Sequence, residues 1–273
     1  MRAKYIGTIG DDVRGNIQRE SLENTGVDTS GLIVREGCPN QTAYILIDER
    51  TGERTVLWQR PDCLRLTPSE IRVDDVVNAK LLHIDGYDIE AAAYAASVAR
   101  ENGIPVSLDV DTVYPGFESV LRHVDYLVAG FGWPGKWTGE PDPFIALEQL
   151  RREYGMSLAA MTLGHDGALA LMGDRWWYSP GFELASVDTT GAGDVFHGAF
   201  CYTLLRDMGM DQALDFSNAA AAINCTAIGA RGHIPSRSEV DSLLSSAASG
   251  KVKRREAPEI LGRMPMKAVQ AAL

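Results

Sequence analysis

Apolar residues along the chain follow two periods, a short one typical of strands and a longer one typical of helices. Bounded apolar runs predict strands at 5–9, 32–35, 42–47, 55–59, 80–84, 106–110, 126–128, 158–163, 168–172 and 175–178. Helical spacing predicts helices at 13–24, 68–73, 89–102, 117–122, 144–154 and 211–228, and one more that opens at the glycine-rich turn near residue 191.

The order of these elements divides the chain into two regions. Residues 31–60 are rich in strands and lack a helical period, so we expect a small sheet set off from the rest, with a hairpin turn at 48–53. From Thr67 onward, strands alternate with helices, which indicates βαβ units and a mainly parallel sheet. We therefore predict a single α/β domain over 1–273, in which helices flank a mainly parallel central sheet and a small β-sheet is inserted at 31–60.

The composition limits which binding partners and which cellular compartment the sequence favours. The 273 residues are 45% hydrophobic and 23% charged, as in an ordinary globular protein. The net charge of −11 argues against binding to nucleic acid or an anionic membrane, because both need basic surface. No signal peptide or membrane-length apolar run is evident. Cys38, Cys63, Cys201 and Cys225 form no C-x-x-C pair, so we expect free thiols in a reducing cytoplasm.

The most specific chemical signal is the run D-T-T-G-A-G-D, which ends at Asp194. A glycine-rich turn that opens a helix points free N–H groups outward at the positive end of the helix dipole, so Gly191, Ala192 and Gly193 predict an anion site. A carboxylate repels phosphate, and Asp194 at this position therefore suggests a general base. The alternative is a first-turn acid in an ordinary helix. No P-loop motif occurs, and Phe196 stands where a dinucleotide fingerprint needs its third glycine.

Several segments, taken in chain order, resemble the PfkB (ribokinase-like) carbohydrate kinases. They are D-T-T-G-A-G-D-V-F-H-G-A-F at 188–200, Ile6–Asp12, Gly26–Ser30, Thr162–Gly167, Asn218–Ala222, Gly229-Ala230 and Ile234-Pro235. The resemblance implies a ribokinase-like fold with a β-sheet lid. It also implies an ATP-dependent phosphotransferase that acts on a hydroxyl of a small sugar or a related polyol or nucleoside, with Mg²⁺.

The resemblance assigns roles to particular positions. Asp194 would be the base, and the N–H groups of Gly191, Ala192, Gly193 and Asp194 would form the anion hole. The nucleotide would contact Thr162, Leu163, Gly164, His165, Asp166, Gly167 and Asn218. A monovalent cation such as K⁺ would be held by Asp188, Thr190, Asn224, Ala227 and Gly229, although Asp188 could instead cap the turn. Asp85 follows a strand and would face the substrate, with a plain turn acid as the alternative.

Two departures from the family pattern leave an alternative open. The usual N-x-x-E motif is replaced by A-G-F-G-W at 129–133, so metal handling must differ or be weakened. The chain also begins after the strand, hairpin and glycine-rich segment with which the family starts. The alternative is a catalytically weak nucleotide- or sugar-binding protein of the same fold. Ile45 and Leu57 on the lid could form a homodimer seam, or pack within the lid.

Overall fold

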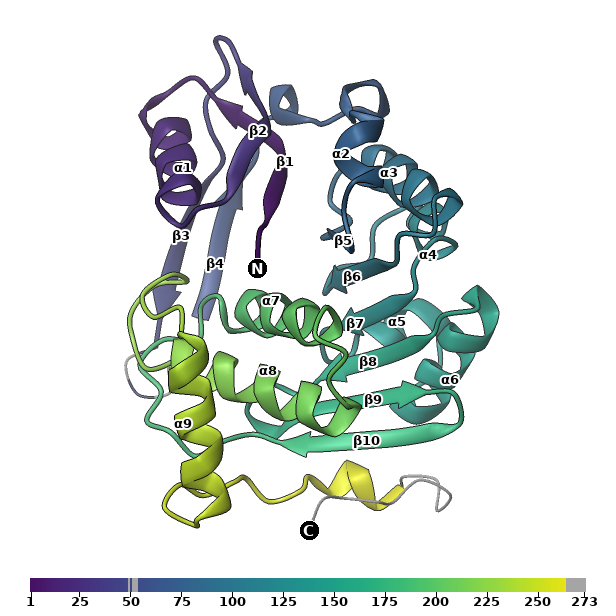
Figure 1. Cartoon of the computed structure of the whole chain (residues 1–273), viewed down its shortest axis with the longest axis vertical. Coiled ribbons are helices and arrows are strands. Elements are labelled where there is room, and N and C mark those ends of the chain that lie inside the picture. Colours follow the sequence, from purple (N-terminus) through teal and green to yellow (C-terminus); the bar gives the residue numbers. More distant parts are fainter. Residues whose placement is uncertain (49, 51–53, 264–273) are drawn as a thin grey trace.

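The computed structural model describes residues 1–48, 50 and 54–263, so most of the turn predicted at 48–53 lies outside the described residues. Its main feature is a six-stranded sheet in the order β10-β9-β8-β7-β6-β5 (Figure 1). Strands β5 (Leu82–Ile84), β6 (Val106–Val110), β7 (Tyr126–Ala129) and β8 (Leu158–Thr162) are parallel. Strands β9 (Gly167–Met172) and β10 (Arg175–Pro180) add an antiparallel hairpin. The predicted mainly parallel sheet is confirmed.

Helices cover both faces of this sheet because successive side chains of each strand point to opposite sides. In β7, Leu127 packs in a cluster with the helices of one face, whereas Val128 packs against Phe196 and Phe200 on the other. The first face carries α3 (Ile89–Glu101), α4 (Glu118–Leu121), α5 (Trp133–Thr138) and α6 (Pro143–Tyr154). The second carries α7 (Ala192–Leu204) and α8 (Met210–Asn224), and α9 (Arg237–Ala248) packs on α8.

The first 60 residues form two smaller sheets. Strands β1 (Lys4–Gly10) and β2 (Asp28–Arg35) are a parallel pair joined by α1 (Val13–Asn24), and Asp12 caps that helix by accepting from the Gly15 N–H at 2.9 Å. Strands β3 (Thr42–Ile47) and β4 (Arg54–Gln59) form an antiparallel hairpin, which we call the lid hairpin. Residues 31–35 of the predicted insert lie in β2, and so pair with β1.

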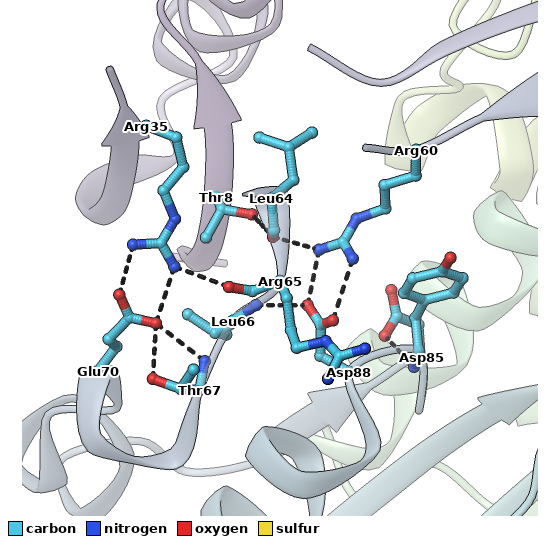
Figure 2. Close-up of polar contacts among 11 residues, drawn as sticks. Thr8, Arg35, Arg60, Leu64, Arg65, Leu66, Thr67, Glu70, Asp85 and Asp88 are labelled. Atoms are coloured by element: carbon cyan, nitrogen blue, oxygen red, sulfur yellow. Dashed lines mark hydrogen bonds and ion pairs between the residues drawn. The ribbon is translucent and has the colours of Figure 1, made fainter. Parts of the chain in front are cut away.

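The segment from residue 60 to 70, which follows the lid hairpin, is held by two guanidinium–carboxylate pairs. The Arg35 nitrogens contact Glu70 at 2.5 and 2.8 Å, and those of Arg60 contact Asp88 at 3.0 and 2.7 Å. Figure 2 shows both pairs facing each other across this segment, with Arg60 also donating to the Leu64 carbonyl. Arg35 comes from β2 and Asp88 precedes α3, so the pairs connect the small sheets to the main domain.

The same segment corrects the expectation of four free thiols. Cys38 and Cys63 form a disulfide across 25 residues, while Cys201 and Cys225 remain thiols. The bridge joins the loop after β2 to the short 3₁₀ turn after β4, and therefore closes the base of the lid hairpin. Cys usage in the sequence carries no signal for this pairing, because the two residues meet only through the fold. One of the sequence arguments for a reducing compartment is thereby removed.

Some element boundaries also differ from the prediction. The helix expected at 68–73 is instead a 3₁₀ turn at Pro68–Glu70 and a separate α2 (Val73–Val77), because Ile71 between them is extended. The structure also contains α5 and α9, which the apolar pattern did not predict. Among the described residues, no helix has the length and apolar character needed to cross a membrane.

Candidate active site

The D-T-T-G-A-G-D run forms the N-terminal end of α7, as its glycines predict. Gly191 is the N-cap with φ of 81°, a left-handed conformation that suits glycine. The first turn holds Asp194, and the Ala192 N–H at its start donates to the Thr189 carbonyl at 3.3 Å. The N–H groups of Gly193 and Asp194 precede the first bond of the helical ladder, which Val195 makes to the Gly191 carbonyl at 2.9 Å. Phe196 and Phe200, two and six residues further, are buried against the sheet and fix the position of the helix. The local geometry is that of an anion site beside a carboxylate.

The two glycines of this turn meet different surroundings. A Cβ at Gly191 would lie 2.7 Å from the Cα atom of Ala230, so this position is closed by the chain itself. A Cβ at Gly193 would have no atom within 4 Å. Gly193 therefore has open space in front of its backbone, where an anion can approach.

Behind the turn, Asp188 joins three segments that the sequence predicted would meet at a cation site. It is 1% exposed, and its carboxylate accepts from the Thr190 N–H at 2.8 Å and the Gly229 N–H at 2.7 Å. The capping interpretation of Asp188 is thus correct in geometry. The Asn224 amide donates to the carbonyls of Ala230 and His233, both at 3.2 Å.

Two oxygen atoms in this cluster are left without a hydrogen-bond partner. They are Oγ1 of Thr190 and Oδ1 of Asn224, and both are buried. A buried acceptor without a partner is costly, and a hard cation with oxygen ligands would satisfy both. Ala227 and Gly229 lie in the loop that follows Asn224, where the Ala227 N–H reaches the Asn224 carbonyl at 3.4 Å. Two unpartnered neutral oxygens beside the segments that Asp188 joins have the ligand chemistry that a hard monovalent cation needs.

The predicted nucleotide loop follows β8. Thr162 ends the strand, Gly164–Asp166 form a 3₁₀ turn, and the Leu163 N–H donates to the Gly167 carbonyl at 2.7 Å. His165 is exposed, and its Nε2 lies 3.1 Å from Asp166. The loop thus turns sharply at the carboxyl end of the sheet, where ligands of α/β proteins bind.

Asn218, predicted to flank the nucleotide base, has a different set of contacts. It is 7% exposed, and its amide nitrogen donates to the carbonyl of Ser179 at 2.9 Å and to the Ser179 hydroxyl at 2.8 Å. Its donors are therefore used to tie α8 to β10. A role toward the nucleotide stays a prediction and would rest on its oxygen atom.

A cavity of about 210 Å³ opens at the carboxyl ends of β5 and β6. It is lined by Asp85, Tyr87, Asp109, Val110, Asp111, Thr112 and Tyr114. The structure thus places Asp85 on a cavity wall, beside two more carboxylates. Asp109 and Asp111 lie at the end of the strand predicted at 106–110, whereas Tyr87 and Tyr114 come from loops with no periodic pattern and were not identified from the sequence.

His197 links this cavity to α7. Its ring is 5% exposed, and its Nε2 lies 2.9 Å from Oδ1 of Asp109, whose side chain is 26% exposed. Asp194 does not belong to the cavity lining, but His197 lies three residues after it and thus on the same side of the helix. The sequence analysis missed His197 as a functional candidate, since a lone histidine carries no ligand spacing.

An anion site at a helix N-terminus, a carboxylate beside it and a cavity at the same edge of the sheet define a phosphate-binding α/β protein. The family model "pfkB family carbohydrate kinase" matches residues 1–237. The ATP-dependent ribose-1-phosphate kinase of Halopiger xanaduensis is 31% identical over 247 residues, covering 89% of this chain and 80% of that protein. The chain therefore belongs to the pfkB family of carbohydrate kinases.

Solved structures agree with the fold. The ribokinase of Thermotoga maritima superposes with a TM-score of 0.76 at 27% identity, covering 89% of this chain and 81% of that one. The fructokinase of Xylella fastidiosa, solved with bound ATP, has a TM-score of 0.78 at 21% identity, and covers 90% of this chain and 85% of that one. The ribokinase-like fold predicted from the sequence is confirmed.

Proposed function

We propose that this protein transfers the terminal phosphoryl group of ATP to a hydroxyl of a small sugar or a related polyol or nucleoside. The observation that carries the proposal is the first turn of α7, which places Asp194 beside the open backbone of Gly193. The relatives named for ribose 1-phosphate, ribose and fructose support this substrate class. The particular acceptor is left to experiment.

In this proposal each part of the α7 turn has one task. The Asp194 carboxylate accepts the proton of the attacking hydroxyl as its oxygen forms a bond to the terminal phosphorus of ATP, and the bond from that phosphorus to the bridging oxygen breaks to release ADP. The N–H groups of Gly191, Ala192, Gly193 and Asp194 would stabilise the negative charge on the transferred group, that of Ala192 by exchanging its 3.3 Å bond to the Thr189 carbonyl. Because the helix is fixed in the core by Phe196 and Phe200, these donors need little reorganisation during the reaction.

The nucleotide would lie against Thr162–Gly167, at the same edge of the sheet as the α7 turn. Mg²⁺ would enter with the ATP phosphates, which are its usual ligands. Within the described residues, no group of three or more His, Cys, Asp or Glu side chains could hold a metal ion. When bound, Mg²⁺ neutralises charge on the phosphate oxygens.

A monovalent cation such as K⁺ would be held by Asp188, Thr190, Asn224, Ala227 and Gly229. The support is the pair of unpartnered oxygens on Thr190 and Asn224. When bound, the cation supplies a fixed positive charge behind the anion hole. The turn itself is held by Asp188, whose carboxylate accepts hydrogen bonds from the N–H groups of Thr190 and Gly229.

The test is ADP release from ATP and Mg²⁺ with D-ribose, D-fructose, ribose 1-phosphate and adenosine as acceptors. Asp194→Asn should lower kcat by roughly 10²–10⁴-fold on the best acceptor, because it removes a general base. Asp211→Asn is a matched control, since Asp211 is likewise a first-turn acid, on α8. Near-wild-type turnover in Asp194→Asn would show that Asp194 is not the base.

A second candidate is a binding protein of the same fold with little catalysis. The segment A-G-F-G-W at 129–133 favours it, because this sequence lacks the family's usual metal-organising Glu. Calorimetry separates the two candidates. Binding of ATP or an acceptor with no ADP release on any acceptor would support the second and refute the first.

We also propose that the lid hairpin mediates a homodimer. Ile45 and Leu57 are 39% and 57% exposed, and their neighbours Tyr44, Leu46 and Trp58 are exposed too. Apolar side chains on both faces of a two-stranded hairpin are unusual for a monomer. Light scattering should give twice the chain mass, and Leu57→Glu should reduce it to one chain. A monomeric wild type would exclude this interface.

A further inference from the structure

The contact between His197 and Asp109 joins the helix that carries the candidate base to the wall of the acidic cavity. His197 belongs to α7 and Asp109 to β6, and the two atoms lie 2.9 Å apart. Packing between a helix and a strand end does not require a polar contact, and the α7 residues Phe196 and Phe200 pack on the sheet through apolar contacts. The polar contact of His197 with Asp109 therefore calls for an explanation other than packing.

The energetics of the pair point to a role beyond stability. The imidazole is 5% exposed, and its other nitrogen, Nδ1, is buried with no hydrogen-bond partner. Leaving a buried polar atom unpaired destabilises the fold, so an apolar side chain of similar size would suit this position as well or better. What the imidazole does provide is a fixed position for one oxygen, Oδ1, of Asp109.

The cavity shows what the other oxygen of Asp109 can do. Asp109 is partly exposed there, beside Asp85 and Asp111, and Thr112, Tyr87 and Tyr114 complete the polar wall. A carboxylate that is held at one oxygen presents the second in a defined direction. A hydroxyl group is a donor that fits such an oxygen, and the acceptors in the proposed reaction are polyhydroxylated.

Resting on the proposed function, we infer that His197 is a positioning residue that orients Asp109, and that Asp109 accepts a hydrogen bond from a hydroxyl of the acceptor. The hydroxyl in question is one that does not react, because the reacting one lies at Asp194. Asp109 therefore determines acceptor affinity and selectivity, while the phosphoryl-transfer step depends on the α7 turn.

The experiment measures acceptor KM, ATP KM and kcat for Asp109→Asn, His197→Leu and His197→Gln, using whichever of D-ribose, D-fructose and adenosine the wild type turns over best. Asp109→Asn and His197→Leu should each raise acceptor KM about tenfold or more, because a hydrogen bond to a charged group is lost or misplaced. ATP KM and kcat should stay within about twofold. His197→Gln should recover most of the loss, because its amide nitrogen can reach Asp109.

The double variant Asp109→Asn/His197→Leu decides whether His197 acts through Asp109. It should be no worse than Asp109→Asn alone, since the two changes remove one interaction. His123→Leu, a partly buried histidine next to β7, is the matched control and should leave acceptor KM unchanged. If His197→Leu shows no cooperative thermal transition, His197→Gln and Asp109→Asn carry the comparison.

Three results would overturn the inference. The first is an unchanged acceptor KM in Asp109→Asn, and the second is an acceptor KM in the double variant that reflects the sum of the two single effects. The third is a His197→Leu single variant in which kcat falls and ATP KM rises. If the wild type releases no ADP with any acceptor, the proposed function fails separately, and calorimetry then takes over. Acceptor binding to Asp109→Asn that is tenfold or more weaker than to the wild type still supports the inference. Equal binding to the two proteins, or no detectable binding to the wild type, refutes it.

Discussion

Removing the Cys38–Cys63 disulfide is the sharpest test of how the lid hairpin is held. The bridge closes a loop of 25 residues that contains β3 and β4. In the chain-entropy account, a closed loop of this length lowers the entropy of the unfolded chain by about 12 cal/mol/K, or about 3.5 kcal/mol at 25 °C. The shift in Tm is this free energy divided by the unfolding entropy. With an unfolding entropy of about 2.1 cal/mol/K for each of 273 residues, the shift is about 6 °C.

The variant is Cys63→Ser, because Cys63 is the exposed partner whereas Cys38 is 2% exposed and packed inside. The assay is calorimetry of wild type and variant, each with and without a thiol reductant. Wild-type Tm should fall by about 6 °C on reduction, while the variant should start low and not respond. The reductant should not act through Cys201, which is already a free thiol and whose pKa burial raises to about 11.

A different pattern would refute the reasoning. Equal Tm values for oxidised wild type, reduced wild type and Cys63→Ser would mean that the bridge does not restrict the chain in the unfolded state whose formation sets Tm. The lid hairpin would then unfold separately from the rest of the domain, despite the two arginine–carboxylate pairs of Figure 2. A fall in the variant of much more than 6 °C would show that Cys63 contributes through packing rather than through loop closure.

Three further predictions follow from contacts elsewhere in the chain. Gly193→Ala should keep wild-type Tm, because its Cβ meets no protein atom within 4 Å, but should lower kcat at least tenfold, because the methyl group would enter the proposed phosphate position. Gly191→Ala should instead lower Tm through its clash with Ala230. Retained activity in Gly193→Ala would refute the anion hole. Arg35 holds the pKa of Glu70 at about 2, below its ordinary 4.5. Ionised Glu70 therefore stabilises the fold fully above pH 4.5, and this stabilisation is lost on acidification toward pH 2. In urea titrations, Glu70→Gln should abolish about 2–3 kcal/mol of the pH dependence of the free energy of unfolding. K⁺ at a hundredfold above its Kd should stabilise the wild type by about 2.7 kcal/mol. Thr190→Val should lose this response, yet be no less stable in K⁺-free buffer, because its buried hydroxyl has no partner there; a K⁺ response in the variant would exclude Thr190 as a ligand.

Much of the fold could be predicted because its signals are local. The strands at 42–47 and 106–110 and the helix at 13–24 match the structure at both ends, since apolar period and capping residues determine them. The α7 turn was equally local, because glycine spacing and Asp194 are adjacent in sequence. Helix α9 was missed even though Ser236 and Glu239 form a capping box, a signal that the apolar pattern alone does not include.

The unpredicted part of the site consists of long-range pairs. Cys38–Cys63, Arg60–Asp88 and His197–Asp109 join residues that are 25, 28 and 88 positions apart. Which partner a cysteine, arginine or histidine meets depends on how whole layers pack, and no periodicity of the sequence carries that information. The predicted strands did place Asp85 and Asp109 at the same edge of the main sheet, because the carboxyl ends of parallel strands meet at one edge.

The period of α7 explains why one helix can serve both the core and the chemistry. Phe196 and Phe200, four residues apart, lie on the face that packs against Val128 of β7. Asp194 and His197, three residues apart, lie on a neighbouring face of the helix, and Nε2 of His197 contacts Asp109 of β6. A shift of α7 in its packing would therefore move Asp194 and His197 together. The core packing that stabilises the fold thus also sets the spacing between Asp194 and the cavity that Asp109 lines.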